Sequence, residues 1–300
     1  MDLGGRRRSD NFEDRGAGRG GGTGGLGVGA LSLAYRFFGL KGVVVAALVL
    51  GGIYLFGSSN VRQSLFGGAT TTTSSAGTVC DASPKNAQAC DFSRAVLAST
   101  EDVWKQEFAA SALPSYGQQP PSTYAMPTLV VFAGAVSTGG CGSATAAVGP
   151  FYCPADRKLY IDPSFYDDLA QTLNSPGDFA QAYVIAHEVG HHVQNLIGSS
   201  RLDVRGETKN QVSVRVELQA DCLAGVWGHF ARSDLAITDA DLGEATQAAH
   251  SIGDDALGHS DQAKFTHGSS QQRIRWFRRG FDSGDPRQCD TFAVRRYDDL

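Results

Sequence analysis

Two histidines and a glutamate stand at the spacing that a zinc site on a helix requires. His187, Glu188 and His191 form the pattern His-Glu-x-x-His. Residues four apart share one face of a helix, so His187 and His191 can bind one cation from consecutive turns. Glu188 lies beside them and can take a proton from a water on that cation. With 7 histidines in 300 residues, this pattern rarely arises by chance; the alternative is a helix whose histidines are merely packed or solvated.

The flanking sequence predicts a helix around this pattern. Ser175 suits the N-cap, Pro176 the first helical position, and Gly198 a C-terminal stop. Apolar side chains recur between them at helical spacing, at Phe179, Ala182, Tyr183, Ala186, Val189, Val193, Leu196 and Ile197. A histidine inside a mostly apolar helix needs a partner for its ring nitrogens, and a metal ion supplies one.

A third protein ligand is required, because catalytic zinc usually has three and keeps a fourth position for water. Glu217 is the candidate, since the 26 residues after His191 allow one helix to end and another to begin. Asp221 is four residues later and can accept a hydrogen bond from the outer nitrogen of a ligand histidine. The alternative is an exposed carboxylate, but a packed helix is indicated by Val216, Ala220, Leu223, Ala224 and Trp227.

The pattern His-Glu-x-x-His followed by Glu-x-x-Ala-Asp at 217–221 resembles the gluzincin metallopeptidases. The wider sequence is similar to the bacterial YpfJ-like family of neutral zinc metallopeptidases over nearly the whole chain. This similarity is carried by the strings at 149–154, 186–194, 217–227 and 266–277. The resemblance implies one zinc ion, with His187, His191 and Glu217 as its ligands, and leaves the substrate open.

By the same resemblance, two more features belong to the substrate site. In gluzincin folds a strand before the active helix pairs with extended peptide, which assigns this role to the predicted strand at 158–162; an ordinary sheet strand is the alternative. The histidine that matches His267 in HtpX-like membrane metallopeptidases faces the active site, so His267 is a candidate for stabilising the oxyanion. A structural role at the cap formed by Ser269 explains His267 equally well, and Tyr183 is an alternative oxyanion donor.

Other polar residues are expected to be structural. On a helix His192 points about 100° away from His191, so it is a poor ligand. Arg273 is expected to pair with a carboxylate near the site. Packed or exposed positions are expected for His229, His250 and His259.

The N-terminal quarter differs in composition from the rest of the chain. Residues 1–36 are rich in glycine and arginine and are expected to be disordered. Residues 37–57 are expected to form a transmembrane anchor, because 42–61 carry no charge and about 20 residues cross a hydrocarbon layer. A cleaved signal peptide and a buried core helix are the alternatives. A Ser/Thr/Gly linker at 58–78 and a metallopeptidase domain at 79–300 follow.

Charge predicts the orientation of this anchor. Residues 1–41 hold seven basic and four acidic groups, whereas the remainder holds 19 basic and 27 acidic groups. By the positive-inside rule the N-terminus is cytoplasmic and the catalytic domain lies in the periplasm or outside the cell. The net charge of −5 does not indicate nucleic-acid binding. The sequence therefore predicts a single-pass protein of a bacterial cell membrane.

The six cysteines fit an oxidising compartment. The pairs Cys80–Cys90 and Cys141–Cys153 have spacings suited to disulfides in loops. Cys222 and Cys289 remain, either as a third pair or with Cys222 as a buried thiol on its helix. A cysteine zinc site is not expected, because the sequence has no Cys-x-x-Cys.

Together these patterns predict a helix-rich α+β domain of the zincin type with a small sheet, preceded by one transmembrane helix. The expected function is that of a membrane-anchored zinc endopeptidase, with Glu188 as general base and a peptide or protein as substrate. One alternative is a catalytically silent, zinc-stabilised binding or scaffold module of the cell envelope, although such a site does not need Glu188. The other is an amidase that acts on cell-wall peptides. Segments 115–127 and 199–211 are candidate covers of the cleft.

Overall fold

A four-stranded sheet forms one layer of the fold. In the computed structural model, which describes residues 1–17, 77–117 and 119–300, the strand order is β1-β2-β6-β5. These strands are β1 (Phe12–Ala17), β2 (Thr128–Ala133), β6 (Lys158–Ile161) and β5 (Phe151–Cys153). β1, β2 and β6 run parallel, whereas β5 runs antiparallel to β6 and is an edge strand. A separate two-stranded sheet joins β3 (Ala135–Ser137) to β4 (Ser143–Thr145).

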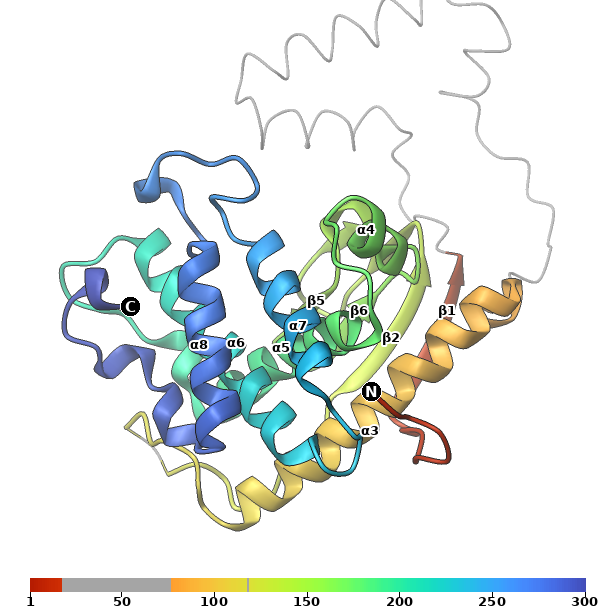
Figure 1. The fold of residues 1–300 in the computed structure, drawn as a ribbon, viewed down its shortest axis with the longest axis horizontal. Coiled ribbons are helices and arrows are strands. Elements are labelled where there is room, and N and C mark those ends of the chain that lie inside the picture. Colours follow the sequence, from red (N-terminus) through yellow and green to blue (C-terminus); the bar gives the residue numbers. More distant parts are fainter. Residues whose placement is uncertain (18–76, 118) are drawn as a thin grey trace, which may run out of the picture. The chain divides into compact units, whose positions relative to one another are not determined.

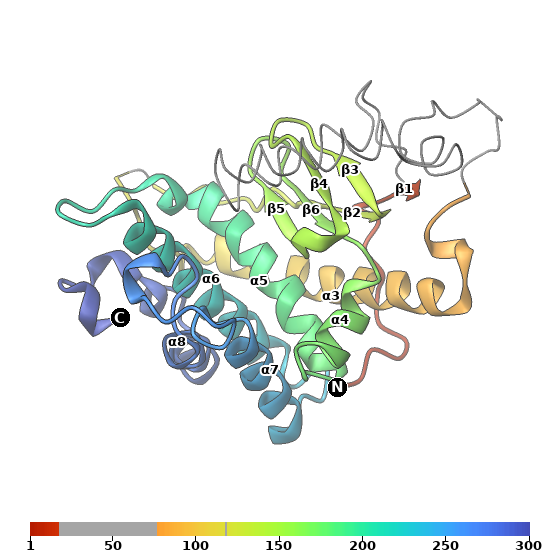
Figure 2. The same cartoon turned by 90° about the horizontal axis from the view of Figure 1, so that it is seen from above.

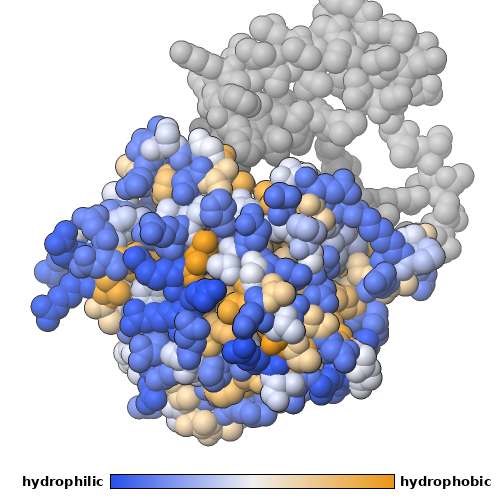
Figure 3. All heavy atoms as spheres, viewed as in Figure 1, coloured by the Kyte–Doolittle hydropathy of each residue, from blue (hydrophilic) through white to orange (hydrophobic). Residues whose placement is uncertain are grey.

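Helices supply most of the regular secondary structure of the described residues, as predicted. They are α3 (Pro84–Ala109), α4 (Phe165–Gln171), α5 (Asp178–Ile197), α6 (Lys209–Ala231), α7 (Asp239–Ser251) and α8 (Ser270–Ser283). Helix α5 packs against α3 and β5 and also against α6 and α7 (Figures 1 and 2), so it lies between the sheet and the other helices. The fold class is therefore confirmed as a helix-rich α+β unit with small sheets. On the face in Figure 3 hydrophilic residues cover most of the described surface, and apolar residues lie in small patches between them.

Helix α5 begins two residues later than predicted, and its first turn is completed by another helix. Gly177 is the N-cap and has no side chain to accept a hydrogen bond. Instead, the carboxylate of Glu244 on α7 accepts from the backbone N–H of Phe179 at 3.1 Å. This satisfies one of the free N–H groups at the helix start. The predicted stop is confirmed, because Gly198 adopts the left-handed conformation that ends the helix.

Two glycines allow α6 and α8 to cross in direct backbone contact. A Cβ atom at Gly280 would lie 1.9 Å from the carbonyl oxygen of Cys222, and a Cβ atom at Gly225 would lie 2.1 Å from that of Phe277. Any larger residue at either position would push the helices apart. The disulfide Cys222–Cys289 joins α6 to the C-terminal segment, and the other pairs are Cys80–Cys90 and Cys141–Cys153.

The N-terminal segment is not disordered over residues 1–17, so that part of the prediction is wrong. β1 pairs with β2, and charged side chains before it form ion pairs with α3: Arg7 with Glu101 at 2.9 Å and Arg8 with Asp91 at 2.6 Å. Composition suggested disorder because it counts few apolar residues. The segment is ordered instead by pairing and charge partners that lie far along the chain.

This pairing constrains any membrane arrangement. β1 and β2 share backbone hydrogen bonds, so residues 12–17 and 128–133 must lie on the same side of a membrane. A cytoplasmic N-terminus with the metallopeptidase domain on the other side is not compatible with this pairing. Within the described residues, the helices are too short or too polar to cross a membrane. The predicted anchor at 37–57 lies outside the described residues.

Candidate metal centre

The crossing of α5 and α6 brings His187, His191 and Glu217 together. One ligand atom from each lies within 4.8 Å of the others. His187 Nε2 is 3.2 Å from one Glu217 oxygen, and His191 Nε2 is 3.5 Å from the other. The close approach depends on Gly190, where a Cβ atom would lie 2.9 Å from the carbonyl oxygen of Ala220 on α6. The sequence-predicted ligands thus converge as a set of two histidines and one carboxylate.

The outer nitrogen of each histidine is held by a separate acceptor. His187 Nδ1 lies 2.8 Å from Asp221 Oδ1, and His191 Nδ1 lies 2.8 Å from Gln194 Oε1. An acceptor at Nδ1 keeps the proton there and leaves the Nε2 lone pair free toward Glu217. This donor set fits tetrahedral zinc with a fourth position for water. The expectation that Asp221 orients a ligand histidine agrees with this geometry.

Burial and charge around the donors favour a cation. Burial opposes ionisation of Glu217, but the charges of His191 and His187 outweigh it and hold the pKa of this carboxyl well below its usual range. Burial alone lowers the pKa of His187, but Asp221 and Glu217 raise it to about 10. The site therefore takes up positive charge, either as a proton or as a metal ion.

Asp221 is the centre of a fully buried polar network. It accepts from the Tyr183 hydroxyl at 2.5 Å and from Arg273 Nε and Nη2, each at 2.9 Å. Arg273, from α8, is 2 % exposed and also donates to the carbonyl oxygen of Ile252. The expected pairing of Arg273 with a carboxylate is confirmed. Tyr183 is 0 % exposed and directed at Asp221, so it does not serve as the alternative oxyanion donor.

Gln194 belongs to a second network that sequence reasoning missed. Its amide nitrogen donates to Val216 O at 2.7 Å and to Gln219 Oε1 at 2.9 Å, which fixes its oxygen toward His191. Ser199 Oγ also donates to Gln219 Oε1, at 2.6 Å. The signal in the sequence was a glutamine three residues after a ligand histidine, within reach on the same helix.

The metal donors line a pocket of about 390 Å³ that also contains Glu188 and His267. Among the described residues, none forms a hydrogen bond or ion pair with the Glu188 carboxylate, so this group is free to accept a proton. Residues 148–152, which include part of β5 beside α5, form one wall of this pocket. Two large apolar side chains of the pocket lining, Val148 and Leu257, are 61 % and 49 % exposed.

His267 is placed by a buried carboxylate. Asp254, 3 % exposed, accepts from the backbone N–H groups of Thr266, His267 and Gly268 at 2.7–3.0 Å. Its other oxygen lies 3.3 Å from His267 Nδ1, which leaves Nε2 available to the pocket. Asp254 was missed, because two adjacent aspartates in a turn, Asp254 and Asp255, carry no pattern that assigns either of them a partner. Ser269 caps α8 as predicted. His267 therefore lies two residues before a helix cap and also lines the metal pocket.

The strand beside the metal helix is β5 and not the predicted strand at 158–162. That strand is β6, whose two edges are taken by β2 and β5. β5 has β6 on one side and, within the described part of the chain, no strand on the other. The reason is topological: β5 is the hairpin partner that precedes β6, and three residues gave too short a pattern to predict.

His192 is not a ligand, as expected, and instead joins α5 to β5. It is 0 % exposed, and burial lowers its pKa to about 4, so its ring is neutral. His192 Nδ1 lies 2.9 Å from the Tyr152 hydroxyl, and Nε2 donates to Ala125 O at 2.6 Å. His229 is also occupied elsewhere, because its Nδ1 donates a hydrogen bond to the carbonyl oxygen of Phe281.

Other groupings in the described residues are already engaged. Asp14 accepts from two backbone N–H groups beside the disulfide Cys80–Cys90, whose sulfurs are not thiolates. Asp241 and Asp178 pair with the amino group of Met1 at 2.8 and 3.4 Å. The cluster on α5 and α6 is therefore the best-formed metal site.

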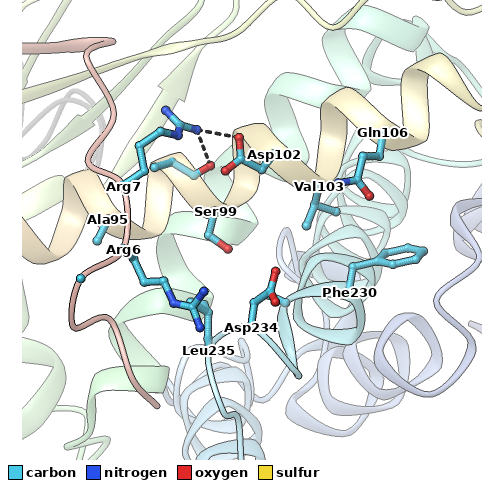
Figure 4. Close-up of a pocket in the computed structure, with 13 residues that line it drawn as sticks. Arg6, Arg7, Ala95, Ser99, Asp102, Val103, Gln106, Phe230, Asp234 and Leu235 are labelled. Atoms are coloured by element: carbon cyan, nitrogen blue, oxygen red, sulfur yellow. Dashed lines mark hydrogen bonds and ion pairs between the residues drawn. The ribbon is translucent and has the colours of Figure 1, made fainter.

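A second hollow, of about 340 Å³, lies between residues 5–7 and helices α3 and α6 (Figure 4). Its lining contains no histidine, cysteine or glutamate. Arg7 points toward α3 and donates to Ala98 O and to Asp102, both at 2.8 Å. This hollow offers paired charges rather than converging metal donors, so it is not a candidate active site.

A helix that carries His-Glu-x-x-His, crossed by a second helix that supplies a glutamate, defines a zinc-hydrolase type of site. The family described as "Putative neutral zinc metallopeptidase" matches residues 1–292, and the chain belongs to this family.

Curated relatives extend this result. YpfJ of Escherichia coli (strain K12) is 43 % identical over 303 residues, which cover 96 % of this chain and 98 % of the relative. Mb2605 of Mycobacterium bovis and Rv2575 of Mycobacterium tuberculosis are each 42 % identical over 188 residues, which cover 57 % of this chain and 64 % of those proteins. All three are described as uncharacterized proteins. No solved structure matches the chain.

Proposed function

We propose that this protein is a zinc-dependent endopeptidase. The observation that carries the proposal is the convergence of His187, His191 and Glu217 in the pocket where the Glu188 carboxylate is free. A purely structural zinc site is closed by four protein ligands, whereas this set leaves one position for water. A silent scaffold would not require an uncommitted base at that position.

Each residue of the site has a separate role in the proposed reaction. When bound, zinc supplies Lewis-acid chemistry: it lowers the pKa of its water and polarises the substrate carbonyl. Glu188 takes the water proton as the water attacks and then delivers it to the leaving amine. His267, with Nδ1 held at Asp254, directs Nε2 to the oxyanion that develops on the carbonyl. The amine and the carboxylate products then leave the pocket.

Edge strand β5 is the proposed binding edge for the peptide. An edge strand accepts an added strand through its unpaired backbone groups, and antiparallel pairing is slightly more stable. Phe151, at the start of β5, lines the metal pocket. Pro154, just after the end of β5, lines a smaller hollow of about 200 Å³. In antiparallel pairing, the residue after the cleaved bond therefore lies over Val148 and Leu257. We expect cleavage before a large apolar residue.

We also propose an oxidising, extracytoplasmic compartment for this unit, because its six cysteines form three disulfides. We further propose that residues 37–57 attach the protein to a bacterial membrane, and the only support for this is that their sequence is apolar.

The test compares the zinc-loaded protein with Glu188→Gln on a proteome-derived peptide pool, with new termini identified by mass spectrometry. Both proteins should bind one zinc ion, and only the wild type should cleave, at internal bonds. Equal cleavage by Glu188→Gln would contradict its role as base. Zinc binding without cleavage of the pool by either protein would favour the scaffold alternative, and hydrolysis of isolated cell-wall peptides in a parallel assay, with the pool left intact, would favour the amidase.

A further inference from the structure

His192 follows a proposed zinc ligand directly and yet faces away from the zinc site. Its ring contacts Tyr124 and Tyr152 edge-on, with ring centroids 5.6 and 5.3 Å away. Its two nitrogens reach two different elements, Tyr152 on β5 and Ala125 in the segment before β2. One buried side chain of the metal helix thus holds both segments.

With one proton on the imidazole ring, the hydrogen bonds of this group admit one arrangement. A carbonyl oxygen only accepts, so His192 Nε2 carries the proton that goes to Ala125 O. His192 Nδ1 is then an acceptor, and the Tyr152 hydroxyl donates to it. The same hydroxyl accepts from Asn195 Nδ2 at 3.0 Å. Every polar atom of the contact between α5 and Tyr152 is satisfied, which makes it a rigid connection.

Tyr152 is the central residue of the edge strand. It lines the metal pocket and also the smaller hollow that contains Asn195 and His191. The following residue, Cys153, is tied to Cys141 by a disulfide and points to the other side of the strand. The hydroxyl of Tyr152 is therefore the main polar link between β5 and the metal helix, beside a longer contact of 3.4 Å from Asn195 Nδ2 to Pro154 O.

We propose that His192 is a positioning residue for substrate: through Tyr152 it holds β5 at the distance from the zinc helix that an extended peptide requires. This inference rests on the proposed peptidase function. It assigns the second histidine of His191-His192 to peptide binding through β5, whereas the first binds metal. Loss of the link weakens binding of peptides that pair with β5 and leaves the zinc ligands in place.

The decisive variant is Tyr152→Phe, which removes the hydroxyl and keeps the ring. Its matched control is Tyr124→Phe. Tyr124 touches the same histidine, but its buried hydroxyl has no hydrogen-bond partner in the described structure. For a peptide long enough to span β5, Tyr152→Phe should raise KM about tenfold with little change in kcat, as expected for about one lost hydrogen bond in binding. Tyr124→Phe should match the wild type, and both variants should bind one zinc ion.

A second measurement does not depend on activity. Amide hydrogen exchange at Phe151, Tyr152 and Cys153 should be faster in Tyr152→Phe than in Tyr124→Phe. Equal exchange in the two variants overturns the link between His192 and β5. Faster exchange with unchanged KM overturns its role in substrate binding. If the wild type cleaves nothing, the proposed peptidase function fails, and the exchange comparison still decides whether His192 positions β5.

Discussion

The two walls of the metal pocket are built on different principles. The helical wall, from α5 and α6, places its ligands through buried networks centred on Asp221 and Gln194. The strand wall, β5 with residues 148–150, is half exposed; beyond the pairing of β5 with β6, it is held by the disulfide Cys141–Cys153 and by the hydrogen bonds of the Tyr152 hydroxyl to α5. The difference indicates that several buried hydrogen bonds hold the metal ligands in place, whereas fewer and more exposed contacts hold the peptide-binding edge. Changes in the helical wall should therefore cost more, and they should affect metal binding first.

The largest effect is expected from Asp221→Asn. It removes the only ion-pair partner of buried Arg273 among the described residues, and breaking a buried ion pair costs about 3–5 kcal/mol. Chemical denaturation should show this loss, together with weaker zinc binding because His187 loses its acceptor. The matched change lies beside the strand wall, in the turn from β5 to β6: Asp156→Asn, since Asp156 accepts from Gly139 N–H and the Tyr160 hydroxyl near the surface. Equal losses in the two variants would contradict the difference between the walls.

Removing one disulfide at a time tests the difference between the helical wall and the strand wall. The Cys222→Ser/Cys289→Ser variant should lose about 4 kcal/mol, because the bridge closes 67 residues. It should also weaken zinc binding, since the Cys289 carbonyl oxygen accepts from Gln219, which holds Gln194.

The corresponding change in the strand wall is Cys141→Ser/Cys153→Ser, whose bridge closes 12 residues and should contribute about 3 kcal/mol. Here zinc binding should persist while KM for long peptides rises. Urea titration, zinc titration and steady-state kinetics separate these outcomes. Loss of zinc from the strand-wall variant would show that the two walls are coupled.

The helical wall was also the part that the sequence predicted best. His187, His191, Glu217 and Asp221 lie in two short windows, and helical periodicity alone decides which of them share a face. Two contacts between distant segments were not predicted. Asp254 meets His267 across a turn, and β1 finds its partner more than 100 residues away in β2. Neither contact leaves a periodic pattern, because each depends on how separate elements pack.

A smaller effect is expected from Gln194→Leu. It leaves the donor set intact but removes the acceptor at His191 Nδ1, so the ring can rotate or carry its proton on Nε2. Zinc affinity should fall about 10- to 100-fold, as is typical when such a partner of a ligand is lost. Competition with a chromogenic chelator measures this change. Asn195→Leu is the control on the same helix, because it contacts Tyr152 rather than a ligand, and its zinc affinity should stay near that of the wild type.

Zinc loading should release a proton in a defined pH window. The pKa of His187 in the metal-free protein, about 10, lies above the ordinary value of 6.5. Its protonation therefore stabilises the metal-free fold fully below pH 6.5, and this contribution is lost as the pH rises through about 10. At pH 8 each zinc ion should displace about one proton from His187. Calorimetry in buffers of different ionisation enthalpy counts the protons, and a count independent of pH from 7 to 11 would contradict the assignment.

The N-terminal segment lies outside both walls, and its ion pairs Arg7–Asp102 and Arg8–Asp91 are exposed enough that each contributes only about 0–1 kcal/mol. Its position nevertheless decides the membrane arrangement. All six native cysteines are in disulfides, so a cysteine introduced as Arg6→Cys or Ser200→Cys is a unique thiol at an exposed position. In intact cells a membrane-impermeant maleimide should label both variants to the same extent, because β1 and β2 belong to one sheet. Labelling of Ser200→Cys alone would indicate that the N-terminus is cytoplasmic and that β1 does not pair with β2 in the cell.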